Sequence, residues 1–248
     1  MSNRFDSITQ QLLMAQEIVF FTGAGISVDS GIPTYRDSGD GLWNSTDPAE
    51  VSSIHSFRDN PEWVWQWYGQ RKVAVDRAKP NYAHLAIAAL EARFPDKRVS
   101  VVTQNIDGLH PRAGSCRVLE LHGSINYIRC HTRCGYKETW TGHTVEKRSC
   151  PNCGGVLRPD IIWFGEELDR TTFSLAEDAA LHADLFISIG TSALIQPAAR
   201  LPLMAKGVGG MFVEVNPETS PMTEASHHSF KMGAATFFHN LMSRLGTA

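Results

Sequence analysis

The most informative stretch of this sequence is Glu17-Ile18-Val19-Phe20-Phe21-Thr22-Gly23-Ala24-Gly25-Ile26-Ser27-Val28. Its first half, Glu17–Thr22, is a short apolar run of the kind that forms a strand buried on both faces of a parallel sheet. Its second half is a Gly-x-Gly turn, whose glycines let the backbone approach a diphosphate at the start of the next helix. Tight turns also use glycine without any ligand, so the turn indicates a dinucleotide site only because it follows the first strand of an α/β chain.

Outward from this stretch, apolar runs alternate with helical and loop segments. The further runs are Val99–Thr103, Val118–Leu121, Leu185–Ile189 and Met211–Val215. Helices are expected over residues 5–15, from Pro61 to about Lys79, and over Tyr82–Phe94. This alternation predicts an α/β fold, with a Rossmann-like parallel sheet covered by helices on both faces.

We expect two domains. The Rossmann-like domain, which carries the dinucleotide turn, takes residues 1–35, 81–123 and 158–248. The small domain combines a loop and helical insertion, 36–80, with a cysteine-rich module, 124–157. Residues 36–60 are polar and look irregular, and the module is too short and polar to form its own core, so metal ligation is expected to hold it.

The bulk composition excludes several classes of protein. The 248 residues carry a formal net charge of −3, which gives no basic field for phosphates, so nucleic acid is not an expected partner. No secretion signal opens the sequence and no run of eighteen apolar residues occurs, so we expect a cytoplasmic protein without membrane association.

The turn departs from the dehydrogenase fingerprint. Val28 replaces the third glycine, and Ser30-Gly31-Ile32-Pro33 ends the following helix at once. The next predicted strand begins only near Val99. A dehydrogenase that transfers hydride is therefore disfavoured.

The five cysteines are unevenly spread. Four of them lie within 24 residues as two pairs, Cys130-x₃-Cys134 and Cys150-x₂-Cys153, while Cys116 stands apart and is expected to be buried. An odd count without a secretion signal argues against disulfides. Paired thiolates beside glycine turns typically enclose zinc, and four thiolates leave no open position, so the predicted zinc is structural. The extra residue in the first pair leaves open that His131 replaces one cysteine.

Further motifs follow the turn in a fixed order. They are Ser30-Gly31-Ile32-Pro33-Thr34-Tyr35-Arg36, Thr103-Gln104-Asn105-Ile106-Asp107-Gly108-Leu109-His110, Leu121-His122-Gly123, Ile162-Trp163-Phe164-Gly165-Glu166, Gly190-Thr191-Ser192 and Val215-Asn216-Pro217-Glu218. In content, order and spacing this set, from about Glu17 to Gly233, resembles the sirtuins. The resemblance implies a protein lysine deacylase with NAD as co-substrate. In that reaction the acyl oxygen of an acyl-lysine attacks C1′ of the nicotinamide ribose, and nicotinamide, free lysine and O-acyl-ADP-ribose are released.

The resemblance also assigns roles to residues. His122 is expected to be the general base that activates a ribose hydroxyl, and Asn105 and Asp107 to contact the nicotinamide and its ribose. A hydrogen-bonded core histidine is the alternative for His122, and helix capping is the alternative for Thr191 and Ser192. The family has Phe at the position of Tyr35. The expected NAD contacts are Gly23, Ala24, Gly25, Tyr35, Arg36, Gln104, Asn105, Asp107, Gly190, Thr191, Ser192, Asn216, Glu218 and Ala235.

Two segments are expected to bind the acylated protein or peptide substrate. The resemblance gives Ile162, Trp163, Phe164 and Gly165 to substrate binding, with Trp163–Glu166 as a strand that pairs with the peptide backbone. Tyr68 and Arg71 lie three residues apart on a predicted helix and share a face. In the sirtuins that remove succinyl, malonyl and glutaryl groups, a Tyr-x-x-Arg holds the distal carboxylate, which suits the planar fork of arginine. Packing of Tyr68 on the helix with a solvated Arg71 is the alternative.

Two other functions remain compatible with these motifs. A mono-ADP-ribosyltransferase would cleave NAD in the same way but pass ADP-ribose to a protein nucleophile. An NAD-binding module would bind the dinucleotide without turnover, although His122, Asn105 and Asp107 together argue against it.

Overall fold

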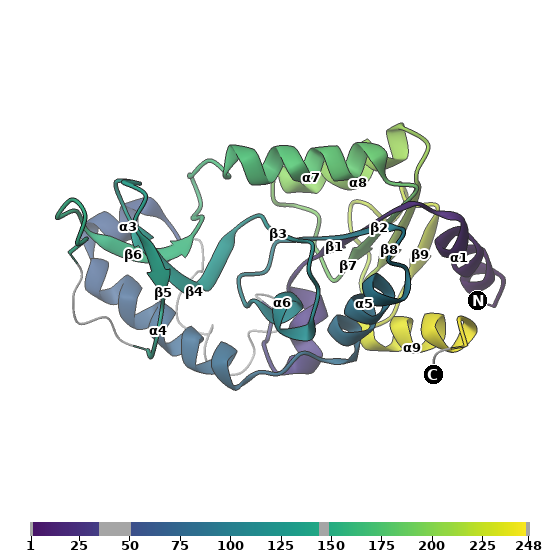
Figure 1. Ribbon diagram of the computed structural model, residues 1–248, viewed down its shortest axis with the longest axis horizontal. Helices are drawn as coiled ribbons and strands as arrows, with labels where there is room; N and C mark the ends of the chain where they lie inside the picture. Colours follow the sequence, from purple (N-terminus) through teal and green to yellow (C-terminus); the bar gives the residue numbers. More distant parts are fainter. Residues whose placement is uncertain (1, 35–50, 144–148, 247–248) are drawn as a thin grey trace.

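The computed structural model describes residues 2–34, 51–143 and 149–246. Six parallel strands form the main sheet, in the order β3-β2-β1-β7-β8-β9. Their bounds are β1 (Glu17–Thr22), β2 (Arg98–Thr103), β3 (Val118–Glu120), β7 (Leu185–Ile189), β8 (Met211–Val215) and β9 (His228–Phe230). Figure 1 shows this sheet in one half of an elongated molecule, with both chain termini at that end.

Helices cover both faces of the main sheet, as predicted (Figure 1). One face carries α1 (Ser2–Met14), α5 (Tyr82–Arg93) and α9 (Ala234–Arg244), and the other carries α7 (Arg170–His182) and α8 (Leu201–Gly207). Successive side chains of β1 point to opposite faces of the sheet. Ile18 and Phe20 pack against α1, α5 and α9, and Val19 and Phe21 pack against α7 and α8. In the described part of the chain, no helix combines the length and apolar character needed to cross a bilayer.

Local signals explain where the predicted elements begin. β1, β7 and β8 have the predicted bounds, and β2 and β3 differ by one residue at one end. α4 (Pro61–Arg77) begins at Pro61 because Asn60 Oδ1 accepts a hydrogen bond from the Trp63 N–H at 3.1 Å. Asn81 caps α5 in the same way, since its side chain accepts from the Ala83 N–H at 2.9 Å.

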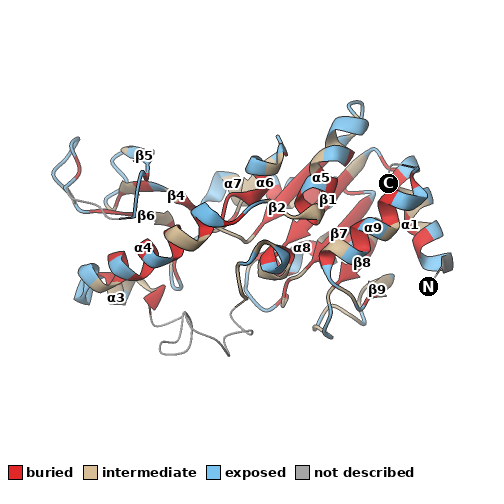
Figure 2. Cartoon of the chain, turned by 90° about the horizontal axis from the view of Figure 1, so that it is seen from below, coloured by how far each residue is buried: buried red, intermediate tan, exposed pale blue. Residues whose placement is uncertain are grey.

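A second, antiparallel sheet forms the other half of the molecule. It consists of β4 (Gly123–Cys130), β5 (Lys137–Thr139) and β6 (Leu157–Ile161), in the order β5-β4-β6. This sheet shares a hydrophobic core with α4 and with α3 (Ile54–Asp59), and Phe57, Trp65, Ile125 and Trp163 belong to that core. Figure 2 shows buried residues in both halves, on the strands of the main sheet and along one side of α4.

The zinc-binding segment has no core of its own, in agreement with the prediction, because α3 and α4 supply many of the apolar side chains that it packs against. Two other details of this half differ from the prediction. Residues 54–59, within the stretch expected to be irregular, form α3, which Ser53 caps by accepting the Ser56 N–H at 3.1 Å. The predicted boundary after residue 157 cuts through β6, whose residues pair with β4. The division into two domains otherwise stays a prediction.

Candidate active site

The predicted NAD contacts gather at one edge of the main sheet, where the carboxyl ends of its parallel strands meet. Gly23 follows β1, Gln104 follows β2, Gly190 follows β7 and Asn216 follows β8. β1 lies between β2 and β7, so the order of strands along the chain reverses at β1. Sheets of this class bind ligands in the crevice at such a switch point.

The glycines of the first turn pack against the turn that follows β7. The Gly25 N–H donates to the Gly190 carbonyl at 2.8 Å, and the Gly23 N–H donates to the Ile189 carbonyl at 3.0 Å. A Cβ atom on Gly25 would lie 2.6 Å from the Gly190 Cα, and Gly190 itself has a φ of +59°. The sequence left open whether these glycines serve a diphosphate or only a tight turn, and the structure shows that chain packing already requires glycine at 25 and 190.

Asn105 and Asp107 are hydrogen-bonded to the segment that follows β1. Asn105 Nδ2 donates to the Gly23 carbonyl at 3.0 Å, and Ser27 Oγ donates to Asp107 Oδ2 at 2.7 Å. Asp107 Oδ1 accepts the Leu109 N–H at 2.9 Å, at the start of α6 (Leu109–Ala113). Burial raises the pKa of Asp107 and outweighs the opposing effect of these hydrogen bonds. Side-chain hydrogen bonds therefore join the loop after β2 to the segment after β1.

Ser27 is a site residue that the sequence interpretation missed. It lies in the 3₁₀ helix η1 (Ala24–Ser30) and is 1% exposed. Its place in the first helical turn after the glycines was a visible signal. Its contact with Asp107 was not, because that contact joins segments 80 residues apart.

His122, which follows β3, is oriented by a backbone carbonyl. Its Nδ1 lies 2.9 Å from the Gln104 oxygen. A carbonyl can only accept, so Nδ1 carries the proton and the Nε2 lone pair remains to accept one. Burial lowers the pKa of His122, and the hydrogen bond to Gln104 offsets part of this effect. The neutral ring is therefore suited to act as a base at neutral pH.

Thr191 joins the turn after β7 to its neighbours. Its Oγ1 accepts from Gln104 Nε2 at 2.8 Å and from the Ala193 N–H at 3.2 Å, and its carbonyl accepts from Asn216 Nδ2 at 3.2 Å. The helix-capping alternative for Thr191 and Ser192 is wrong, because the next helical turn, η2, begins only at Ala198.

The remaining predicted NAD contacts lie in or next to other elements of the main sheet's half, or outside the described residues. Ala24 opens η1, Glu218 lies in the exposed segment after β8, and Ala235 lies in the first turn of α9. Tyr35 and Arg36 lie outside the described residues, so their predicted contacts stay predictions.

The segment from Ile162 to Glu166 connects the two halves, but it is not the predicted strand. The Ile162 N–H donates to the His122 carbonyl at 2.9 Å, and the Phe164 N–H donates to the Ser52 carbonyl at 2.8 Å. Within the described residues, the strand pairing of Phe164 is limited to an isolated bridge with Ser53, and a turn follows at Gly165, whose φ is +83°. Phe164 is 46% exposed, whereas Trp163 is buried.

Tyr68 and Arg71 lie on the buried face of α4. Trp163 Nε1 donates to Tyr68 Oη at 2.9 Å, and Ser52 Oγ lies 2.9 Å from the same oxygen. Arg71 Nη1 donates to the Trp67 carbonyl at 3.2 Å. The alternative of a solvated Arg71 is wrong, because its side chain is buried.

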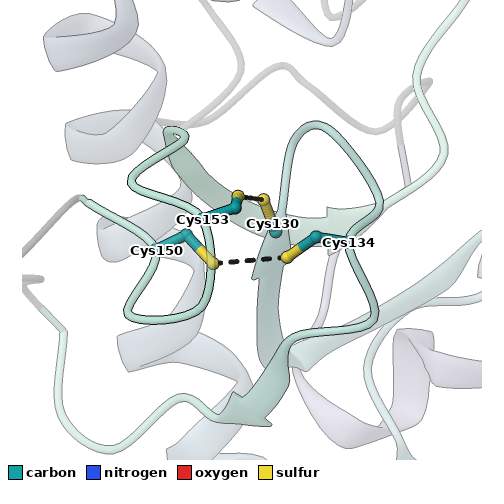
Figure 3. Close-up of side chains that lie close together, drawn as sticks. All are labelled: Cys130, Cys134, Cys150 and Cys153. Atoms are coloured by element: carbon teal, nitrogen blue, oxygen red, sulfur yellow. Dashed lines mark hydrogen bonds between the residues drawn. The ribbon is translucent and has the colours of Figure 1, made fainter.

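The four clustered cysteines meet at one point between the loops that join the small strands, as Figure 3 shows. Their Sγ atoms all lie within 4.8 Å of one another, with 3.5 Å separating Cys130 from Cys153 and Cys134 from Cys150. A tetrahedral zinc ion with Zn–S bonds of about 2.3 Å places its sulfurs about 3.8 Å apart, so these residues fit a structural zinc ion. His131 is not a member of this group. Cys116, expected to be buried, is exposed.

A Rossmann-like sheet with a dinucleotide turn at its switch point, joined to a four-cysteine module, defines a class of NAD-binding α/β proteins. The profile of the Sir2 family matches residues 23–197. This chain belongs to the Sir2 family.

Relatives and solved structures agree with this assignment. NAD-dependent protein deacylase 1 of Caldanaerobacter subterraneus subsp. tengcongensis is 45% identical over 94% of this chain and 96% of its own. The NAD-dependent protein deacylase of Aeropyrum pernix is 47% identical over 92% of each chain. A solved Sir2 homologue in complex with NAD superposes with a TM-score of 0.90 at 38% identity, covering 98% of this chain and 95% of that one.

Proposed function

We propose that this Sir2-family protein is an NAD-dependent protein lysine deacylase that removes acetyl groups and also succinyl and malonyl groups. Full-length similarity to NAD-dependent protein deacylases supports the general reaction. The observation that carries the proposal is the 2.9 Å contact between His122 Nδ1 and the Gln104 carbonyl. It provides a base with an accepting Nε2 at the edge of the sheet where dinucleotides bind.

Different residues of the chain would bind the cofactor, orient it and accept the proton. NAD, when bound, supplies the ADP-ribosyl group whose bond to nicotinamide breaks. Gly23, Gly25 and the N–H groups of η1 would face its diphosphate. Asn105 and Asp107, held by Gly23 and Ser27, would position the nicotinamide end without further rearrangement. His122 would take a proton from a ribose hydroxyl at Nε2, and the Gln104 carbonyl would stabilise the imidazolium through Nδ1.

The acylated lysine would lie against the segment from Ile162 to Gly165. Phe164 is the exposed side chain of this segment, and the Ile162 N–H is bonded to the carbonyl of His122 itself. A peptide bound along this segment would therefore present its acyl group next to the proposed base.

Tyr68 and Arg71 support the wider acyl scope. Both side chains are buried on one face of α4, and Tyr68 Oη contacts Trp163 within the proposed peptide-binding segment. The planar guanidinium of Arg71 can donate two parallel hydrogen bonds to a carboxylate, which a succinyl or malonyl group carries and an acetyl group lacks.

The test is incubation with NAD and matched acetyl-lysine and succinyl-lysine peptides, with nicotinamide, free peptide and O-acyl-ADP-ribose quantified together. Arg71→Met should lower kcat/KM for the succinyl peptide by about 10-fold to 100-fold, the size expected for a lost charge-assisted pair, and spare the acetyl peptide. Arg77→Met is the matched control, because Arg77 is exposed at the end of the same helix.

Equal loss of both activities in Arg71→Met would contradict the carboxylate contact. ADP-ribose attached to protein, in place of O-acyl-ADP-ribose, would identify a mono-ADP-ribosyltransferase instead. NAD binding without release of nicotinamide from any peptide mixture would identify a binding module.

A further inference from the structure

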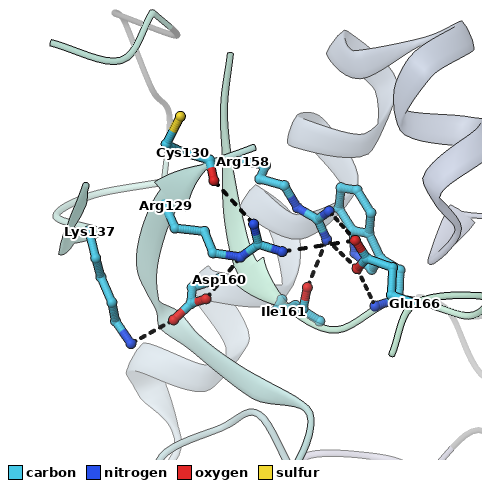
Figure 4. Close-up of polar contacts among 8 residues, drawn as sticks. Arg129, Cys130, Lys137, Arg158, Asp160, Ile161 and Glu166 are labelled. Atoms are coloured by element: carbon cyan, nitrogen blue, oxygen red, sulfur yellow. Dashed lines mark hydrogen bonds and ion pairs between the residues drawn. The ribbon is translucent and has the colours of Figure 1, made fainter. Parts of the chain in front are cut away.

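An ion pair joins the fully buried Arg158 to the partly buried Glu166, which directly follows the proposed peptide-binding segment (Figure 4). Arg158, on β6, has a side chain that is 0% exposed. Its Nη1 donates to Glu166 Oε1 at 2.6 Å and its Nη2 to Glu166 Oε2 at 2.8 Å, and Nη2 also donates to the Ile161 carbonyl at 2.8 Å. A buried pair of this kind adds little net stability, because removing both charges from water costs about as much as their attraction returns.

Glu166 uses the same carboxylate to shape the segment. Its Oε2 accepts the Trp163 N–H at 2.9 Å, and its own N–H donates to the Trp163 carbonyl at 3.0 Å. The turn that contains Phe164 and Gly165 is thereby closed at both ends. The indole of Trp163 lies over the Arg158 guanidinium, with Cζ 3.3 Å from the ring centroid, so Trp163 points inward while Phe164 points to solvent.

Further charges hold Glu166 from the other side. Arg129 Nη2 lies 3.9 Å from Glu166 Oε1, Arg129 Nε lies 3.1 Å from Asp160 Oδ1, and Arg129 Nη1 donates to the Cys130 carbonyl at 3.1 Å. Burial alone would raise the pKa of Glu166, but the hydrogen bonds and charges of Arg158 and Arg129 hold it below its ordinary value. The carboxylate is therefore ionised at neutral pH.

We propose that Glu166, held by Arg158, is a positioning residue that fixes the Trp163–Glu166 turn in the shape that receives the acyl-lysine peptide. This inference rests on the proposed function and deepens it. A purely structural pair would stabilise the small sheet as a whole. A positioning residue acts on peptide binding and leaves NAD binding unchanged.

The experiment compares the wild type with Glu166→Gln and with the paired variant Arg158→Met/Glu166→Leu. The paired variant removes both charges, so no unpaired buried charge is left to unfold the sheet. Glu167→Gln is the matched control, since the neighbouring Glu167 side chain is 82% exposed in a surface pair with Arg170. The readouts are the Kd and KM of an acetyl-lysine peptide, the Kd of NAD, and hydrogen exchange of the backbone over residues 162–167.

In Glu166→Gln and in the paired variant, the Kd and KM of the peptide should rise about tenfold, the size expected for one lost charge-assisted hydrogen bond. Exchange over residues 162–167 should become faster, the Kd of NAD should stay within about twofold, and Glu167→Gln should match the wild type.

Wild-type peptide affinity in the folded paired variant would overturn the inference, as would a parallel loss of NAD affinity. A wild-type protein that releases no nicotinamide with any acylated peptide would instead refute the proposed function. The two failures are therefore distinguishable.

Discussion

The imidazole of His122 takes its tautomer from a single backbone atom, the Gln104 carbonyl oxygen. Gln104 also donates from its side chain to Thr191, so one residue joins the proposed base to the turn after β7. Replacing His122 should therefore remove the base while the loops that surround the ligand-binding edge keep their contacts.

His122→Ala should lower the deacylation rate by about 10²-fold to 10⁴-fold, the usual contribution of a positioned general base, and should retain NAD affinity. Nicotinamide release with a saturating acetyl-lysine peptide measures the first quantity, and calorimetry measures the second. His182→Ala is the control, because His182 is exposed on α7. Full turnover by His122→Ala would refute the proposed role.

At the residue scale, the resemblance to sirtuins selected Asn105, Asp107 and His122, and the structure places them just after β2 and β3. Their roles stay predictions. The sequence could not identify the groups that hold them. The Ser27–Asp107 contact depends on the register of β1 against β2, in which Thr22 lies beside Thr103. Registers of that kind are fixed by the assembled sheet rather than by neighbours along the chain.

The two turns after β1 and β7 pack so closely against each other that a Cβ atom on Gly25 would lie 2.6 Å from the Gly190 Cα. Gly25→Ala should destabilise the protein by about 2–3 kcal/mol, because the new methyl group would overlap the Gly190 backbone and push the strands' ends apart. Thermal and urea unfolding measure this loss.

The matched control for this substitution is Gly207→Ala. Gly207 ends α8, and a Cβ atom there would meet nothing within 4 Å. Alanine also favours helix over glycine, so this variant should be as stable as the wild type or more stable by up to about 1 kcal/mol. An unchanged unfolding midpoint for Gly25→Ala would show that the two turns tolerate separation.

Elements marked by an apolar run or a helix-start signal were predicted well, and elements without such a signal were not. β1, β7, β8 and α4 follow from apolar runs and from the Asn60-Pro61 start signal. The three-residue strand β9 has no pattern long enough to read. The Trp163–Glu166 stretch was wrongly predicted as a strand. Glu166 pairs with the buried guanidinium of Arg158, and its carboxylate accepts the Trp163 N–H, which closes a turn.

Two buried histidines make the stability of the whole molecule sensitive to acid. His84 and His110 are 0% and 1% exposed, with ring centroids 4.8 Å apart. Burial lowers the pKa of His84 to about 4, and burial with the nearby charge of His84 lowers the pKa of His110 to about 3. The unfolded chain therefore binds protons first as pH falls below about 6.5, and stability is lost progressively towards pH 4.

His110→Gln should remove the part of this acid-induced loss of stability that comes from His110. Between pH 7 and pH 5, the wild type should lose about 2 kcal/mol more unfolding free energy than the variant. Burial raises the pKa of Glu120 to about 7, so its protonation makes the folded state more stable as pH falls and partly cancels the effect of the histidines. For this reason the wild type is compared with the variant. His182→Gln, at an exposed position, should keep the wild-type dependence. Parallel curves for His110→Gln and the wild type would contradict the prediction.

At the scale of the whole molecule, the alternation of strands and helices predicted the main sheet, and the cysteine spacing predicted the metal site. The second sheet escaped prediction because its core is shared. Phe57 and Trp65 come from one part of the chain and Ile125 and Trp163 from others, so no single stretch shows the alternation of an independent core.

The pairing of β1 with β7 joins residues 17–22 to residues 185–189, and it has a consequence for synthesis. As the chain leaves the ribosome, β1 emerges early, but its second neighbour is the product of a much later stage of translation. Until then one edge of this apolar strand offers its peptide groups to any other chain. We therefore expect the sheet to close on this side of β1 only after β7 and Gly190 have emerged.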